Sequence, residues 1–150
     1  MDKTKLLEKM NECLRHEWTG VAQYAQAGFV VAGLWREVYS EMFFDSAKES
    51  FGHAKKVGEK IVALGGVPTV ERNPVKQATE LTEMLNFALE FESKAVKCYN
   101  EALALASGDR ALEVFLEDIL VEEQEGVDTL TRILRDPKAV AASSGASKAG

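Results

Sequence analysis

The chain of 150 residues has the size of one ordinary domain, and its 46% hydrophobic and 28% charged residues exclude a wholly disordered protein. Its 18 basic and 24 acidic residues give a net charge of −6, so no basic excess is available to bind a nucleic-acid backbone. Charged residues interrupt every apolar stretch well before the ~18 residues that a membrane span needs, and the charged N-terminal segment does not resemble a secretory signal. We therefore expect a cytoplasmic protein that binds neither nucleic acid nor membrane.

The first half of the chain predicts two long helices. Apolar residues recur every three or four positions over residues 4–32, and Gly33 interrupts this pattern. The same spacing returns over residues 36–64. The second helix is expected to end at the Gly65-Gly66-Val67-Pro68 run, which is typical of a helix terminus.

The second half predicts two more helices and a tail. The third helix is expected to begin between Pro74 and Glu80 and to continue to Ala106. The fourth is expected over residues 109–135, because Pro137 prevents much further helix. We interpret residues 1–135 as one domain. Residues 136–150 are expected to form a flexible C-terminal tail, since only Ala, Val, Ser, Gly and Lys occur from position 139 onward.

The lengths of the connections predict how the helices are arranged. Short connections after the first and third helices favour two antiparallel hairpins. The middle connection of about 10–14 residues reaches about 33–46 Å when extended, whereas a helix of about 28 residues is about 42 Å long. We therefore predict an all-α four-helix bundle with a long crossover between the second and third helices.

Polar residues interrupt the apolar seams of three of these helices. Glu17 and Glu123 occupy positions where a bundle normally has a hydrophobic residue, and His53 lies on the inner face of the second helix. A single glutamate on a seam is usually turned to solvent or paired with a basic residue. Because all three positions fall near the middle of their helices, we favour a common metal ion, which would offset the cost of burying carboxylates.

The third helix leaves two candidates open. Glu90 follows an apolar run, but Lys94 lies one turn later, and the pattern selects Glu92 almost as well.

The sequence resembles bacterioferritins and their relatives in the ferritin-like superfamily over about residues 4–135. The resemblance rests on these features: Glu17 with Gln23-Tyr24; His53-Ala54 with Leu64-Gly65-Gly66-Val67-Pro68; Glu83-Met84-Leu85 with Ala88-Leu89-Glu90; and Ile119-Leu120 with Glu123. It implies a di-iron ferroxidase centre within each subunit. It also implies a homo-oligomeric shell that stores the ferric product.

Matched position by position, the resemblance makes Glu17, His53, Glu90 and Glu123 metal ligands from the four helices. Tyr24 matches the tyrosine close to the metal site in that family, which hydrogen-bonds a ligand or supplies an electron. We therefore take Tyr24 as the candidate catalytic side chain.

Several positions depart from the family pattern. Ser50 replaces the bridging glutamate three residues before His53, and Gly126 replaces the second histidine. Glu49 shares a helical face with His53 and is a candidate substitute ligand. The alternative, to which we give equal weight, is that the Glu49 side chain is exposed to solvent. Phe51 stands where the family has the methionine that binds haem, so haem is not expected.

Two functions remain open at this point. The first is an iron-oxidising and iron-storing oligomer. The second is a ferritin-like structural or metal-binding protein whose degenerate site no longer oxidises iron. The sequence does not decide whether the chain is a ferroxidase.

The two cysteines, Cys13 and Cys98, are 85 positions apart, which fits neither a disulfide framework nor a CxxC metal site. We expect two free thiols that pack as small hydrophobic residues.

Overall fold

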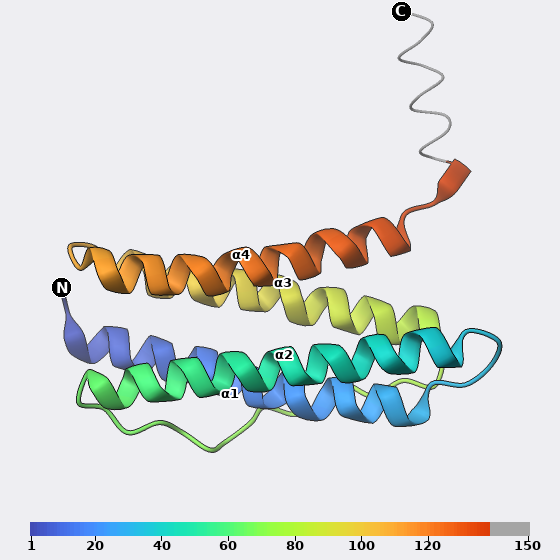
Figure 1. The fold of residues 1–150 in the computed structure, drawn as a ribbon, viewed down its shortest axis with the longest axis horizontal. Helices are drawn as coiled ribbons and strands as arrows, with labels where there is room; N and C mark the ends of the chain where they lie inside the picture. The colour runs from blue at the N-terminus through green and yellow to red at the C-terminus, as the bar shows by residue number, and fades with distance from the viewer. Residues whose placement is uncertain (139–150) are drawn as a thin grey trace, which may run out of the picture.

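The computed structural model describes residues 1–138 and confirms the all-α four-helix bundle (Figure 1). Its helices are α1 (Lys3–Val30), α2 (Arg36–Ala63), α3 (Leu81–Leu105) and α4 (Arg110–Leu134). Each end lies close to its expected position, and α3 begins just after the expected range. Most of the expected tail falls on residues 139–150, which lie outside the described part of the chain.

Side-chain caps and left-handed glycines define where several helices begin and end. The carboxylate of Asp2 accepts a hydrogen bond from the backbone N–H of Lys5, and Asp109 accepts one from Leu112. Gly65 and Gly108 follow α2 and α3 with positive φ angles of 87° and 100°, a conformation that a side chain would strain.

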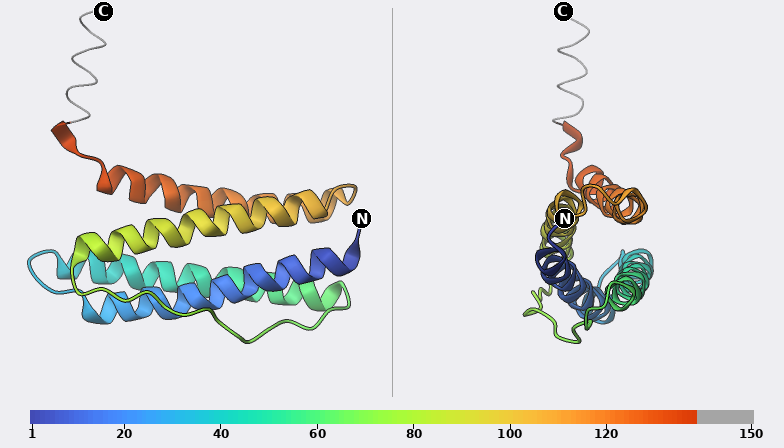
Figure 2. Two further views of the ribbon diagram at one scale, coloured as in Figure 1. Left: turned by 180° about the vertical axis from the view of Figure 1, so that it is seen from behind. Right: turned by 90° about the vertical axis from the view of Figure 1, so that its left-hand side faces the viewer.

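α1 with α2 and α3 with α4 form two antiparallel hairpins, and the hairpins pack together mainly through α1 and α3. α1 packs against both α2 and α3, and α3 packs against α4. Viewed end-on, the four helices form an open arc with α2 and α4 at its ends (Figure 2).

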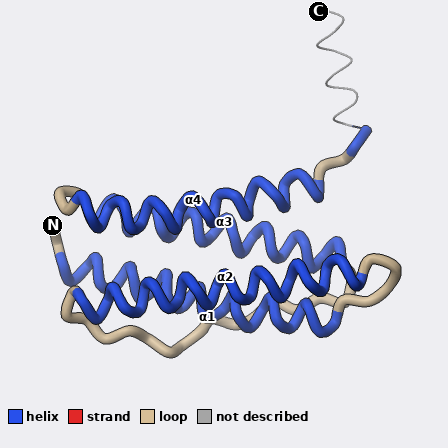
Figure 3. Tube along the Cα trace, in the orientation of Figure 1, coloured by secondary structure: helices blue, strands red, loops and turns tan. Residues whose placement is uncertain are grey.

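The long crossover between α2 and α3 is also confirmed (Figure 3). Residues 64–80 return along α1, so that α3 begins beside the α1–α2 turn (Figure 1). Polar side chains of α1 bind the backbone N–H groups of this segment in order: Asn11 binds Thr69, Thr19 binds Asn73 and Gln23 binds Lys76. These bonds satisfy the backbone of a segment that has no regular structure of its own.

The apolar core is divided into two clusters. One contains Leu6, Met10, Leu14, Val57, Ile61 and Leu116, and the other contains Tyr24, Phe43, Leu85, Phe91 and Leu130. Polar residues at intermediate positions along the helices are nevertheless buried: Glu17, Ser50, His53, Glu92 and Glu123. The fold therefore buries a polar group near the middle of the bundle.

The expectation of free thiols is wrong. Cys13 of α1 and Cys98 of α3 form a disulfide, with Cα atoms 5.8 Å apart, within the range that disulfides require. Packing of α1 against α3 brings the two residues together, and their separation along the chain gives no sign of it.

Across residues 1–138, no helix combines the length and the apolar character needed to cross a membrane.

Candidate metal centre

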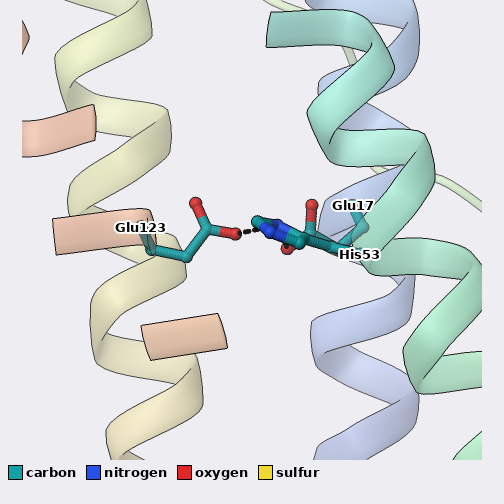
Figure 4. A group of neighbouring side chains, drawn as sticks. All are labelled: Glu17, His53 and Glu123. Atoms are coloured by element: carbon teal, nitrogen blue, oxygen red, sulfur yellow. Dashed lines mark hydrogen bonds and ion pairs between the residues drawn. The ribbon is translucent and has the colours of Figure 1, made fainter. Parts of the chain in front are cut away.

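Three buried side chains from three helices converge in the middle of the bundle (Figure 4). The Nδ1 atom of His53 lies 2.9 Å from a carboxylate oxygen of Glu123 and 3.5 Å from one of Glu17. Each of the three residues is at most 2% exposed. The structure thus brings together the three residues that interrupt the apolar seams of α1, α2 and α4.

The structure does not bring Glu90 into this cluster. The Glu90 side chain is 41% exposed and pairs with Lys76 at 2.5 Å and Lys94 at 3.2 Å. The Lys76 ammonium, followed by that of Lys94, lowers the pKa of this carboxyl. Glu90 is therefore an outward-facing ion-pair partner.

Glu92 takes the inward position on α3 instead. It is only 8% exposed, and a shift of two residues rotates a side chain by about 200° around a helix. Ala88, Ala95 and Tyr99 are all buried and lie on the same face, at spacings of four, three and seven residues from Glu92. The ligand position that the resemblance assigned to Glu90 is thus wrong for this structure, and the spacing of this buried row is a sequence signal that could have selected Glu92.

Two buried tyrosines hold site carboxylates. Tyr24 donates a hydrogen bond of 2.5 Å to Glu92, and Tyr99 donates one of 2.9 Å to Glu17. Tyr24 lies beside the site as expected. Sequence reasoning missed Tyr99, although its spacing from the inward positions of α3 could have revealed it.

The second nitrogen of His53 faces two further carboxylates. Its Nε2 atom lies 2.5 Å from Glu122 and 4.0 Å from Glu49. The two glutamate side chains are 46% and 52% exposed. Ser50, which stands at the bridging-ligand position, is buried but offers only a hydroxyl. Glu49 approaches the histidine from its Nε2 side.

Burial and mutual repulsion shift the pKa values of the cluster. Desolvation, reinforced by Glu123, raises the pKa of Glu92 to about 9. Desolvation and the nearby Glu17 carboxylate raise the pKa of Glu123. Burial alone would lower the pKa of His53, but hydrogen bonds to Glu123 and Glu17 outweigh it and raise the pKa. In the absence of a metal, protons supply the positive charge that the cluster needs.

Two buried carboxylate oxygens without hydrogen-bond partners indicate that the cluster fits a metal ion. The Oε2 atoms of Glu17 and Glu92 are buried without any hydrogen-bond partner. Such atoms are rare in folded proteins and costly to bury. Ligand atoms of Glu17, His53 and Glu123 all lie within 4.8 Å of one another. Carboxylate and imidazole donors suit iron, manganese and zinc, so the residues present fit a transition-metal ion.

A cavity of about 520 Å³ adjoins the cluster between α2 and α4. Glu92 and Tyr24 form part of its wall. Its other acidic lining residues are Glu41, Asp45, Glu49, Glu122 and Glu125. This negative lining favours the approach of cations.

Several proteins with solved structures are similar to this chain in fold and sequence. A ferritin-like diiron-carboxylate protein from Bacillus anthracis str. Ames matches with a TM-score of 0.87 and 33% identity, over 90% of this chain and 99% of the other. The dodecameric thioferritin from Bacteroides fragilis matches with a TM-score of 0.84 and 26% identity, over 95% of this chain and 92% of the other.

Bacterioferritin from Rhodobacter capsulatus is similar in both sequence and structure. The sequences are 28% identical over 134 residues, which cover 84% of this chain and 80% of the bacterioferritin. Its crystal structure, with a metal-free dinuclear site and haem iron, matches with a TM-score of 0.79 and 25% identity, over 87% of this chain and 84% of the other. The family model for the ferritin-like domain matches residues 7–140, and the chain therefore belongs to the ferritin-like family, with bacterioferritin among its relatives.

Proposed function

We propose that this protein binds Fe(II) at the buried centre and oxidises it, and that a homo-oligomer of the chain stores the ferric product. One observation carries the proposal. Carboxylates and an imidazole from all four helices meet in the middle of the bundle, and two of their oxygens lack any partner there. A cation supplies both the missing charge and the missing contacts.

Glu17, His53, Glu92 and Glu123 are the proposed inner ligands, and Glu49 is a further ligand on the cavity side. Negative carboxylate ligands stabilise Fe(III) more than Fe(II), which favours oxidation of the bound ion. Tyr24 is the proposed catalytic side chain. Its hydroxyl contacts Glu92, from where it can hold that ligand in place or supply an electron.

Assembly into a shell is part of the same proposal. The relative from Bacteroides fragilis is dodecameric. Large apolar side chains on the surface of this chain also favour contact with further copies: Phe29, Leu34, Trp35, Val67 and Val70 are 64–97% exposed. We propose a cytoplasmic assembly without haem, since the phenyl ring of Phe51 offers no ligand where the family has methionine.

The altered ligand set favours a second candidate function. Ser50 and Gly126 remove two of the ligands that the family resemblance implies. A centre with fewer ligands could hold a metal for structural reasons and leave it unoxidised.

A titration with Fe(II) separates the two functions. Purified protein receives increasing Fe(II) while absorbance and oxygen uptake are recorded together. Saturable oxidation that is lost in Glu17→Ala and Glu123→Ala supports the ferroxidase proposal. Glu8→Ala, an exposed glutamate on the same helix as Glu17, is the matched control and should oxidise iron normally. Saturable binding without oxygen uptake would instead favour the metal-binding protein.

A further inference from the structure

The disulfide between Cys13 and Cys98 lies beside the candidate metal centre. Cys13 precedes the proposed ligand Glu17 by four residues, which places it on the same helical face, about 6 Å away along the axis of α1. Cys98 directly precedes Tyr99, whose hydroxyl donates a hydrogen bond of 2.9 Å to Glu17. Cys13 and Tyr99 also belong to one buried apolar cluster, against which Cys98 packs. Each end of the disulfide is therefore close to Glu17 or to its hydrogen-bond partner.

The two cysteines differ in their access to solvent. Cys13 is only 1% exposed, whereas Cys98 is partly exposed. Thiol–disulfide exchange begins when an external thiolate attacks one sulfur of the bond and the other sulfur leaves. A small thiol from solution meets Cys98 first, so Cys13 is the sulfur that leaves. The structure thus gives the bond a solvent end at Cys98 and an inner end at Cys13.

The chemistry of a cysteine pair matches a need of iron storage. Two thiols release two electrons when they close to a disulfide, and each Fe(III) ion takes up one electron when it becomes Fe(II). Stored ferric hydroxide is insoluble, so release of the iron calls for such a reductant. In a cytoplasm, the proposed location of this protein, thiols keep most cysteines reduced, and the disulfides that do form there are usually transient and catalytic or redox-sensing.

We propose that Cys13 and Cys98 form a reversible redox couple that returns Fe(III) in the centre to Fe(II). The two thiols lose their protons and two electrons, the Sγ–Sγ bond forms, and two Fe(III) ions become two Fe(II) ions. This inference rests on the proposed function, because it requires the centre to oxidise iron.

Two molecules of a small thiol reopen the bond. The first attacks Sγ of Cys98, which forms a mixed disulfide and releases Cys13. The second attacks the mixed disulfide and leaves with the first as an external disulfide. The two protons of the small thiols end on Cys13 and Cys98, so the pair is ready for another round.

A single round of oxidation tests the couple. The protein is reduced, freed of reductant and loaded with Fe(II) without oxygen. It is then mixed with catalase and enough oxygen to oxidise at most two Fe(II) ions per chain. Ferric absorbance is followed by stopped flow, and the remaining thiols are counted afterwards. In the wild type we expect the absorbance to rise and then decay, with one thiol lost for each Fe(III) reduced. Cys13→Ala with Cys98→Ala should show the rise without the decay.

The two phases separate this inference from the proposed function. No initial rise in the wild type would reject iron oxidation at the centre, and with it the redox couple. A rise that persists in the wild type while both thiols remain would overturn the couple and leave the proposed function standing.

The matched control is the same double variant mixed with one equivalent of dithiothreitol per chain, which supplies two thiols in free solution. Groups that a protein holds in position react much faster than the same groups in solution. Ferric absorbance should therefore decay at least about tenfold faster in the wild type than in this control. Equal rates would show that the position of the cysteines is irrelevant and would overturn the proposal.

Single variants test the direction of exchange and do not depend on the double variant. Cys13→Ala retains Cys98 and should form a mixed disulfide with oxidised glutathione, detected as an increase in mass. Cys98→Ala should leave Cys13 unmodified until urea unfolds the chain. Equal or faster modification of Cys13 would overturn the assigned solvent end. Neither variant can close the bond, so ferric decay at the wild-type rate in either one would overturn the couple.

Discussion

The Glu92 carboxylate of α3 lies directly against Gly126 of α4, so closely that a Cβ atom at position 126 would be 3.0 Å from Glu92 Cδ and 3.1 Å from Oε2. The missing second histidine and the inward position of Glu92 are therefore parts of one arrangement. With no side chain at position 126, the carboxylate occupies space beside α4 that a larger residue would fill.

Replacing Gly126 with alanine should weaken the inner metal site. The new methyl group would push the Glu92 carboxylate away from its present position, where Tyr24 holds it. We expect affinity for Zn(II) to fall by about tenfold, an effect typical of disturbed ligand orientation, as measured by isothermal titration calorimetry.

Gly58→Ala is the control for this variant. Gly58 also lies within a helix, but its Cβ would meet only Pro68 at an ordinary 3.8 Å. This substitution should leave Zn(II) affinity unchanged and stabilise the helix by about 0.5–1 kcal/mol. Wild-type affinity in Gly126→Ala would show that Glu92 does not contribute to the metal site.

Glu92 and Glu90 should differ sharply in their effect on iron chemistry. Glu92→Gln removes a carboxyl group that can bind the ion as an anion, so we expect a tenfold or greater loss of Fe(II) oxidation rate, on the order of the losses seen for electrostatic groups in active sites. Glu90→Gln removes an exposed charge and should behave as the wild type. Initial rates of oxygen uptake measure both. Equal rates in the two variants would remove Glu92 from the proposed ligands.

Periodicity predicted the helices because long apolar seams fix which face of each helix is buried. It also singled out Glu17, His53 and Glu123, since each is a polar residue within such a seam. The choice between Glu90 and Glu92 was harder because apolar residues adjoin both positions, and the contacts of Lys76 and Lys94 show that Glu90 points outward.

Two other features depended on contacts that a single sequence does not display. Glu122 belongs to the acidic run Glu122-Glu123-Gln124-Glu125, in which no pattern singles it out, but the structure places it against His53. The pairing of Cys13 with Cys98 likewise follows from the packing of α1 on α3.

The metal-free protein should lose stability as the pH rises from 5 to 8. Glu92 has a folded-state pKa of about 9, well above its unfolded value, so the folded state keeps a proton that the unfolded chain releases. The raised pKa of His53 acts in the same direction, since its contribution to stability is complete below the unfolded pKa and declines as the pH rises from there toward the folded pKa. Each such proton lowers the free energy of unfolding by up to about 1.4 kcal/mol per pH unit.

Urea unfolding at a series of pH values measures this slope. Glu92→Gln should flatten it, because the amide does not titrate, and Glu90→Gln should not. Saturating Zn(II) should counteract the loss of stability at higher pH, since metal binding favours deprotonated ligands. A metal-free stability that increases steadily with pH would contradict the raised pKa values of this cluster.

The disulfide should stabilise both the bundle and the geometry of its centre. Cys13 lies one helical turn before Glu17, and Cys98 directly precedes Tyr99, which donates a hydrogen bond to Glu17. The bond therefore joins α1 to α3 beside a contact of the metal centre. By loop-closure entropy, a disulfide across 85 positions contributes at most about 4–5 kcal/mol.

Cys13→Ala with Cys98→Ala should lower the free energy of unfolding by a substantial part of that amount, measured with urea under non-reducing conditions. Dithiothreitol should destabilise the wild type and leave the double variant unchanged, which separates loss of the bond from loss of packing. If the bond also fixes the distance between Glu17 and Tyr99, Zn(II) affinity should fall in the reduced wild type and in the variant alike. Unchanged affinity in both would show that helix packing alone positions Glu17, and that the disulfide acts only on the stability of the fold.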